Sequence, residues 1–220
     1  MTRDAPEFRF LSQWRVLGTV GDVAGVLGDV REFARWWPSV YLDVDELEPG
    51  AEGGVGKRVR LRTKGWLPYT LHWDFRVTES RHPHGFVIEA EGDLAGRGEW
   101  TFEQAGAWTI ASYDWRVRAE KPLLRALAPL FASALAANHR WAMRMGERSL
   151  ELELARRRAA TSAERAKIPP PPAPVPSTPL LLAGGAGLVA AFVLARSIRA
   201  TRLIARRRRR RGWRSKLRLG

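Results

Sequence analysis

The chain has 220 residues, enough for one folded domain with appended segments. It contains no cysteine, which excludes disulfides, thiolate nucleophiles and cysteine metal sites. The net charge of +14 lies in the tail, because residues 1–167 hold 25 Lys and Arg against 23 Asp and Glu, whereas residues 168–220 hold 12 basic residues and no acid. A nearly neutral domain does not indicate a nucleic-acid-binding face, so no nucleic-acid partner is expected.

The first residues predict a short flexible end followed by a strand. Residues 1–7 are polar, and no apolar run of seven or more follows Arg3, so a flexible N-terminus without a secretory signal is expected. Apolar and polar side chains then alternate, which indicates a strand with one buried face. The side chains on that face are Phe8, Phe10, Trp14 and Val16.

Two short helices are expected after this strand. Gly21 breaks the strand pattern, and Asp22 is a suitable N-cap for the first helix. The second helix is expected from Arg31 to about Trp36. Pro38 ends it, because the residue before a proline disfavours helical geometry.

Six more segments predict strands. Most of them show period-2 alternation, which is typical of strands with one buried face. Their short connections favour an antiparallel meander. The predicted strands are Val40–Glu48, Gly56–Trp66, Tyr69–Ser80, Phe86–Glu91, Arg97–Glu103 and Trp108–Ala119.

A long helix is predicted from Pro122 to Arg158. Proline is tolerated in the first turn, and leucines and other apolar residues recur at helical spacing after it. Pro129 predicts a kink or a break into two helices. Residues 8–158 are therefore expected to form an α+β domain, in which a curved antiparallel sheet of about seven strands wraps on the long helix and leaves room for a cavity.

The C-terminal part predicts attachment to a membrane. Residues 159–179 are expected to be a Pro-rich linker, residues 180–198 a transmembrane helix, and residues 199–220 a polybasic tail. A cluster of arginines beside an apolar helix favours anionic headgroups. The expected localisation is single-pass in a membrane, with residues 180–220 as the membrane contact.

Other interpretations of the tail stay open at this point. One is an apolar helix docked on the domain with a disordered end, and another is a nucleic-acid-binding arm at Arg206–Arg211. The orientation is open as well. The charge bias places the tail in the cytoplasm, whereas no signal for exporting the domain is present.

Two stretches of the sequence carry a family resemblance. They are residues 14–30 (WRVLGTVGDVAGVLGDV), with the first strand and first helix, and residues 31–40 (REFARWWPSV), with the second helix and an aromatic-Pro turn. In both stretches the chain resembles the helix-grip superfamily, which includes birch-pollen-allergen-like proteins, lipid-transfer START domains and bacterial polyketide cyclase/dehydrases. The resemblance extends to near Arg148. The resemblance implies that the chain holds an apolar small molecule or lipid between sheet and helix. It implies no particular reaction, because the family has no universal catalytic motif.

Seven residues are candidates for contacting such a ligand. Five rings on the same-parity face of successive strands are either cavity lining or plain core, and Trp37 either closes the cavity mouth or fastens a short helix to the sheet. His139 either points inward or is an ordinary solvated residue. No metal site and no cofactor are expected, because no ligand cluster has suitable spacing. The seven candidates are Trp73, Phe75, Trp100, Tyr113, Trp115, Trp37 and His139.

The leading functional hypothesis is a membrane-attached binding or transfer protein for an apolar small molecule or lipid. The second is an enzyme similar to polyketide cyclases and dehydratases, for which Tyr113 and His139 are the only inward acid–base candidates. The third is an interaction module with a filled core. Whether the chain is an enzyme is therefore left open, and the lining of any cavity should discriminate among the three.

Overall fold

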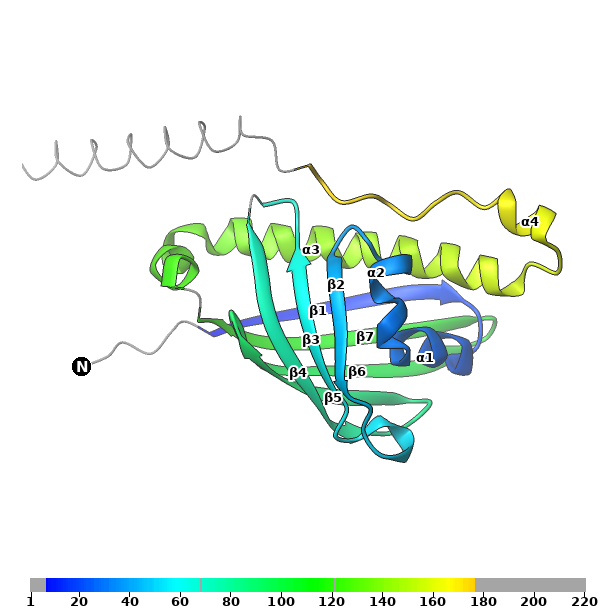
Figure 1. The fold of residues 1–220 in the computed structure, drawn as a ribbon, viewed down its shortest axis with the longest axis horizontal. Coiled ribbons are helices and arrows are strands. Elements are labelled where there is room, and N and C mark those ends of the chain that lie inside the picture. The colour runs from blue at the N-terminus through cyan, green and yellow to red at the C-terminus, as the bar shows by residue number, and fades with distance from the viewer. Residues whose placement is uncertain (1–6, 68, 121, 177–220) are drawn as a thin grey trace, which may run out of the picture. The chain divides into compact units, whose positions relative to one another are not determined.

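The computed structural model describes residues 7–67, 69–120 and 122–176, apart from the side chains of residues 119 and 122–131 (Figure 1). Its centre is one sheet of seven antiparallel strands in the order β1-β7-β6-β5-β4-β3-β2. The predicted curved antiparallel sheet is therefore confirmed. The strands are β1 (Glu7–Leu17), β2 (Tyr41–Glu48), β3 (Arg58–Lys64), β4 (Thr70–Ser80), β5 (Gly85–Gly92), β6 (Leu94–Ala105) and β7 (Trp108–Ala119).

Every strand from β2 to β7 pairs with its neighbour in sequence, as short connections dictate. β1 is the exception, because it crosses to pair with β7 along its whole length, from Glu7 opposite Arg118 to Leu17 opposite Trp108. Alternate side chains of β1, β3, β4, β6 and β7 are buried, so one face of the sheet carries the apolar core. The strand periodicity therefore determines which side chains face the helices.

Two short helical segments follow β1. They are α1 (Val20–Gly28) and α2 (Phe33–Trp36), and a single 3₁₀ turn, η1 (Val30–Glu32), comes between them. Asp22 was expected to cap α1, and this is wrong. Thr19 is the N-cap: its hydroxyl accepts from the Asp22 amide, while the Asp22 carboxylate accepts from the Thr19 amide. This reciprocal pair satisfies two amides at the helix start, which explains why the helix begins three residues earlier.

The long helix α3 runs from Pro122 to Arg158 as one element. Pro129 was expected to kink the helix or to break it into two. The helix is continuous, and Figure 1 shows that its first turns point in a different direction from the rest, as a kink would produce. The later turns pack on β1, β7 and α1. This long helix confirms the second half of the predicted architecture.

A buried carboxylate joins α3 to α2. Glu153 is 2% exposed and accepts hydrogen bonds from Arg35 of α2, at 3.0 and 2.7 Å, and from Arg157, at 2.9 Å. Burial raises the pKa of Glu153, but the hydrogen bonds from the two guanidiniums outweigh burial and hold that pKa below its ordinary value. The carboxylate therefore stays charged, and it ties the short helix to the long one.

The segment after α3 returns along the domain. A short helix, α4 (Ser162–Ala166), comes first, and Figure 1 shows the following residues running back beside α3. We call residues 168–175 the Pro-rich strap. Arg156 donates a hydrogen bond to the Pro169 carbonyl, and Lys64 Nζ donates one to the Val175 carbonyl at 2.6 Å. The strap, which is part of the expected linker, is thus held against the domain near both of its ends.

The expected transmembrane helix at 180–198 and the polybasic tail at 199–220 lie outside the described residues. Among the helices that the structure does describe, none combines the length and the apolar character needed to cross a bilayer.

Candidate functional site

A continuous layer of aromatic rings covers the inner face of the sheet. Trp100 of β6 stands opposite Tyr113 of β7, and their rings stack with centroids 4.4 Å apart. Trp115 extends the layer from Tyr113 at 5.8 Å, and Trp73 of β4 lies 5.8 Å from Trp115. Phe75 follows Trp73 at 6.2 Å. The five predicted rings therefore converge on one interior, as their shared strand parity indicates.

Trp37 packs between this layer and α3. It follows α2 directly, is 4% exposed, and makes edge contacts with Trp14 at 5.4 Å and Tyr41 at 5.1 Å. A glycine of α3 makes room for the indole, because a Cβ at Gly146 would lie 2.2 Å from Trp37 Cζ2. Trp37 thus fastens α2 to the core, which was the alternative to closing the cavity mouth.

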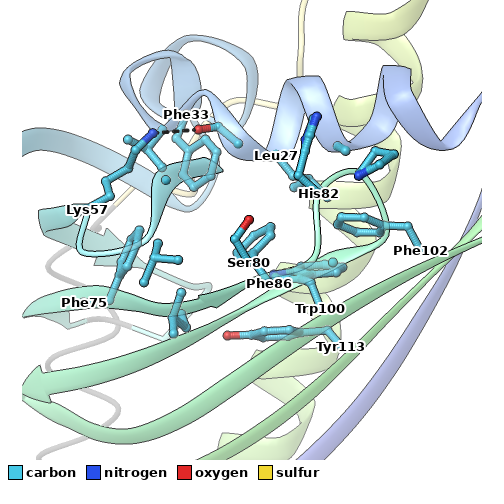
Figure 2. Close-up of a pocket in the computed structure, with 18 of the residues that line it drawn as sticks. Leu27, Phe33, Lys57, Phe75, Ser80, His82, Phe86, Trp100, Phe102 and Tyr113 are labelled. Carbon is cyan, nitrogen blue, oxygen red and sulfur yellow. Dashed lines mark hydrogen bonds between the residues drawn. The ribbon is translucent and has the colours of Figure 1, made fainter. Parts of the chain in front are cut away.

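The first cavity has a volume of about 410 Å³ and lies between the ring layer and the helices (Figure 2). Phe75, Trp100 and Phe86 approach it from the sheet, and Leu27 and Phe33 approach it from the helices. Three exposed lining residues, Gly28, Gly53 and His82, mark where it reaches the surface. The remaining lining residues are Ala24, Val30, Trp37, Tyr41, Gly54, Lys57, Trp73, Val77, Ser80, Pro83, Gly85, Ile88, Phe102, Tyr113 and Met143.

Few polar side chains line this cavity. Near the mouth, Lys57 Nζ donates to the Gly28 carbonyl at 3.2 Å and lies 3.8 Å from a Glu46 oxygen, so its charge is already paired. Ser80 and His82 also belong to the mouth region. The deep end holds only the phenols of Tyr41 and Tyr113 as lining hydroxyl groups among the described residues.

Burial raises the pKa of both phenols at the deep end. The pKa of Tyr41 is raised by burial alone. The pKa of Tyr113 is raised chiefly by burial, and further by the negative charges that Tyr41 and Asp114 carry when ionised. Both groups therefore stay neutral at physiological pH and offer O–H donors. Tyr41 and Tyr113 also share a second surface, because both line a smaller cavity as well.

A second, smaller cavity of about 160 Å³ lies on the other side of this deep end. His139 of α3 lines it, with its ring stacked on Phe10 at 4.5 Å and its Nε2 3.3 Å from Ser12 Oγ. Burial and the charge of Arg140 lower the pKa of His139 to about 4. His139 is therefore a neutral, inward side chain rather than a solvated one.

The two cavities share one wall, so the seven predicted residues do not surround a single space. Phe75 and Trp100 line the first cavity only, whereas Trp115 and His139 line the second only. Trp37, Trp73 and Tyr113 line both, together with Tyr41 and Met143.

Sequence reasoning missed the contribution of the helices and turns. Leu27 and Phe33 lie on helical faces whose apolar spacing is visible in the sequence. That spacing indicates a buried face, but it does not distinguish a face that lines a cavity from one that packs against other side chains. The turns at Gly53 and His82 carry no such signal, because only the tertiary structure brings them to the mouth. No group of three or more His, Asp or Glu side chains suited to hold a metal occurs within the described ranges.

No protein-family model and no curated protein matches the chain. Solved structures do. The protein TTHA0849 from Thermus thermophilus is 14% identical with a TM-score of 0.54, and the match covers 70% of this chain and all of that one. The Zhui aromatase/cyclase from Streptomyces sp. R1128 is 19% identical with a TM-score of 0.56, over 71% of this chain and 99% of that one.

The di-domain ARO/CYC protein BexL from the BE-7585A biosynthetic pathway also matches. It is 21% identical with a TM-score of 0.51, and the match covers 68% of this chain and 50% of that one. Identities this low show a common fold and do not establish a common activity.

Proposed function

Because the chain has the helix-grip fold, we propose that it binds an apolar small molecule or lipid in the first cavity, between the curved sheet and the helices. The observation that carries this proposal is a hollow of about 410 Å³ walled mainly by rings and aliphatic side chains. Ligand sites commonly occupy roughly 300–1,000 Å³ and are mostly apolar. Removing apolar ligand surface from water, at about 25 cal/mol per Å², would supply most of the affinity.

The lining supports binding rather than acid–base catalysis. A catalytic acid or base works best when its pKa lies near the operating pH. Burial moves the phenols of Tyr41 and Tyr113 away from that range, Lys57 is paired, and His139 belongs to the second cavity. His82 lines the first cavity only at its exposed mouth. Among the described residues, the deep end therefore offers hydrogen-bond donors but no imidazole or carboxylate for proton transfer.

The test is recovery of the ligand. The full chain, purified from its own host, is expected to release a stoichiometric apolar compound on solvent extraction, detected by mass spectrometry. Val77→Trp places an indole in the cavity and should abolish recovery, whereas Arg76→Trp, at an exposed position on the opposite face of the same strand, should leave it unchanged. A ligand-free protein under several growth conditions, or equal recovery from both variants, would contradict the proposal.

Membrane attachment is the second part of the proposal. It is supported by the uncharged run within residues 180–198 and by the arginine-rich residues 199–220. The full chain should float with vesicles that contain anionic lipids, and a chain that lacks residues 179–220 should not. Fractionation of the full chain as soluble protein at low and at high salt would remove this part of the proposal.

A cyclase or dehydratase is the alternative function. It is favoured by the structural likeness to proteins whose names state aromatase/cyclase activity, and by the two phenols, which are able to polarise a carbonyl. Incubation with a linear poly-β-ketone thioester, followed by mass spectrometry for loss of water, separates the two functions. Turnover that Tyr113→Phe abolishes would favour the enzyme over the binding protein.

A further inference from the structure

Two hydroxyl groups at the deep end of the first cavity have no hydrogen-bond partner among the residues that the structure describes. They belong to Tyr41 of β2 and Tyr113 of β7, which are brought together only by the curvature of the sheet. Neither is among the fully enclosed side-chain atoms that lack a partner. Both oxygens are thus accessible, and the cavities that the two rings line are where a molecule would reach them.

The other polar groups of the deep wall are already satisfied or sealed away. The indole N–H of Trp73 donates to Thr63 Oγ1 at 2.9 Å, and the indole N–H of Trp37 is enclosed by protein. Buried polar groups in proteins are almost always hydrogen-bonded, because leaving them unpaired costs free energy. The hydroxyl groups of Tyr41 and Tyr113 are therefore the polar groups of this wall that are accessible and still need a hydrogen-bond partner.

The charges and donors around the two phenols indicate which kind of ligand group would bind to them. The phenols stay protonated, so each offers a donor. The lysine that lines the first cavity is paired near the mouth, and a bare anion at the deep end would be desolvated without a counter-charge. A carbonyl oxygen is uncharged, and its two lone pairs allow it to accept from two donors at once.

We propose that the ligand is an uncharged, mainly apolar molecule that carries a carbonyl oxygen at its leading end, and that Tyr41 and Tyr113 recognise this oxygen by hydrogen bonding. This inference rests on the proposed binding function. The apolar body of the molecule fills the space between Phe75, Trp100 and Phe33, toward the mouth (Figure 2). The phenols thus determine which apolar molecules are accepted.

A glycine positions one of the two donors. A Cβ at Gly98 of β6 would lie 2.5 Å from the Tyr113 hydroxyl oxygen and 2.9 Å from Trp115 Cε3. Any larger residue would therefore push the phenol away from its present place. Gly98 is a positioning residue in this account, since its missing side chain is what lets the Tyr113 hydroxyl lie across the floor of the cavity.

The experiment compares two probes of nearly equal shape, 2-acetylnaphthalene and 2-isopropylnaphthalene, of which only the first has a carbonyl. Their affinities for the full chain are measured by isothermal titration calorimetry. Tyr113→Phe and Tyr41→Phe should each weaken binding of the ketone by roughly 3- to 10-fold, the usual contribution of one hydrogen bond. Binding of the hydrocarbon should change by less than about 2-fold, because Phe retains the ring.

Tyr69→Phe is the matched control, because Tyr69 lines the second cavity only. It should leave both affinities unchanged. The carbonyl stretch of the bound ketone provides a second measurement, on the unaltered protein. It should move to lower frequency than in hydrocarbon solvent, and should return toward the solvent value in the double Tyr→Phe variant.

The outcomes separate this inference from the function beneath it. If the hydrocarbon binds but the Phe variants leave the ketone unaffected, or weaken both probes equally, the carbonyl inference is wrong and the binding function stands. An unshifted carbonyl stretch in the unaltered protein leads to the same conclusion, even if a variant fails to fold. If neither probe binds the unaltered protein, both the proposed function and the inference fall.

Discussion

At the scale of single residues, the same rings form the core and line the cavities. Trp73, Trp100 and Tyr113 are each no more than 8% exposed, yet each faces a cavity. Core packing and cavity lining are thus not alternatives for these residues. Large rigid rings bury much apolar area, and a layer of them on a curved sheet leaves unfilled space above it.

His139 makes the pH dependence of stability testable. Its pKa is about 4 in the folded chain, well below the ordinary value of 6.5. Between these values the unfolded chain binds a proton at this residue that the folded chain does not, so the free energy of unfolding falls as the pH drops from 6.5 toward 4. Well above 6.5, where His139 is neutral in both the folded and the unfolded chain, the residue contributes no pH dependence.

We therefore expect a steeper loss of stability between about pH 7 and pH 5 in the unaltered protein than in His139→Gln. Urea unfolding at several pH values measures both slopes, and the difference between the two proteins removes the contribution of the carboxylates that they share. Parallel slopes would show that His139 is as free to be protonated in the folded chain as in the unfolded one.

At the scale of the elements, the position of α3 depends on how closely it approaches the sheet. Gly146 allows α3 to lie directly on Trp37, and Glu153, two turns later, receives Arg35 from α2. A helix interior normally disfavours glycine by about 1 kcal/mol relative to alanine. Glycine at this position therefore reflects packing rather than helix propensity.

Replacement of two helical glycines tests this. Gly146→Ala should lower the free energy of unfolding by about 1–3 kcal/mol, because the new Cβ overpacks against the indole of Trp37. Gly25→Ala, on the exposed face of α1 with nothing within 4 Å of the new Cβ, should raise it by up to about 1 kcal/mol. Chemical denaturation measures both. Stabilisation by Gly146→Ala would mean that α3 is not seated as closely as described.

At the scale of the whole molecule, the Pro-rich strap, which follows the last helices, contacts a buried residue of the sheet. Lys64, which is 7% exposed and lines the second cavity, donates to the Val175 carbonyl of the strap. Ile168, Pro171, Pro172 and Val175 are partly buried, so the strap is packed on the domain along its length. A segment expected to act as a spacer is therefore also a part of the folded unit.

We expect Lys64→Met to loosen the strap, because the side chain keeps its bulk but loses the ammonium donor. The chain has no cysteine, so a nitroxide on Ala173→Cys, an exposed strap position, is the sole label. Its electron paramagnetic resonance lines should become narrower in Lys64→Met. Lys57→Met, near the mouth of the first cavity, is the control and should leave them unchanged. Equal line widths in all three proteins would show that Lys64 does not hold the strap.

The sequence by itself determined the seven strands, the long helix and the inward face of each strand, because hydrophobic periodicity is a local property that survives in any packing of the chain. It also identified the five rings of the sheet layer. Only the tertiary structure decided that the interior is divided into two cavities, that Tyr41 and Tyr113 both belong to the wall between them, and that the strap folds back on Lys64. These features depend on the curvature of the sheet and on contacts between residues far apart in the chain, and no spacing pattern records such contacts.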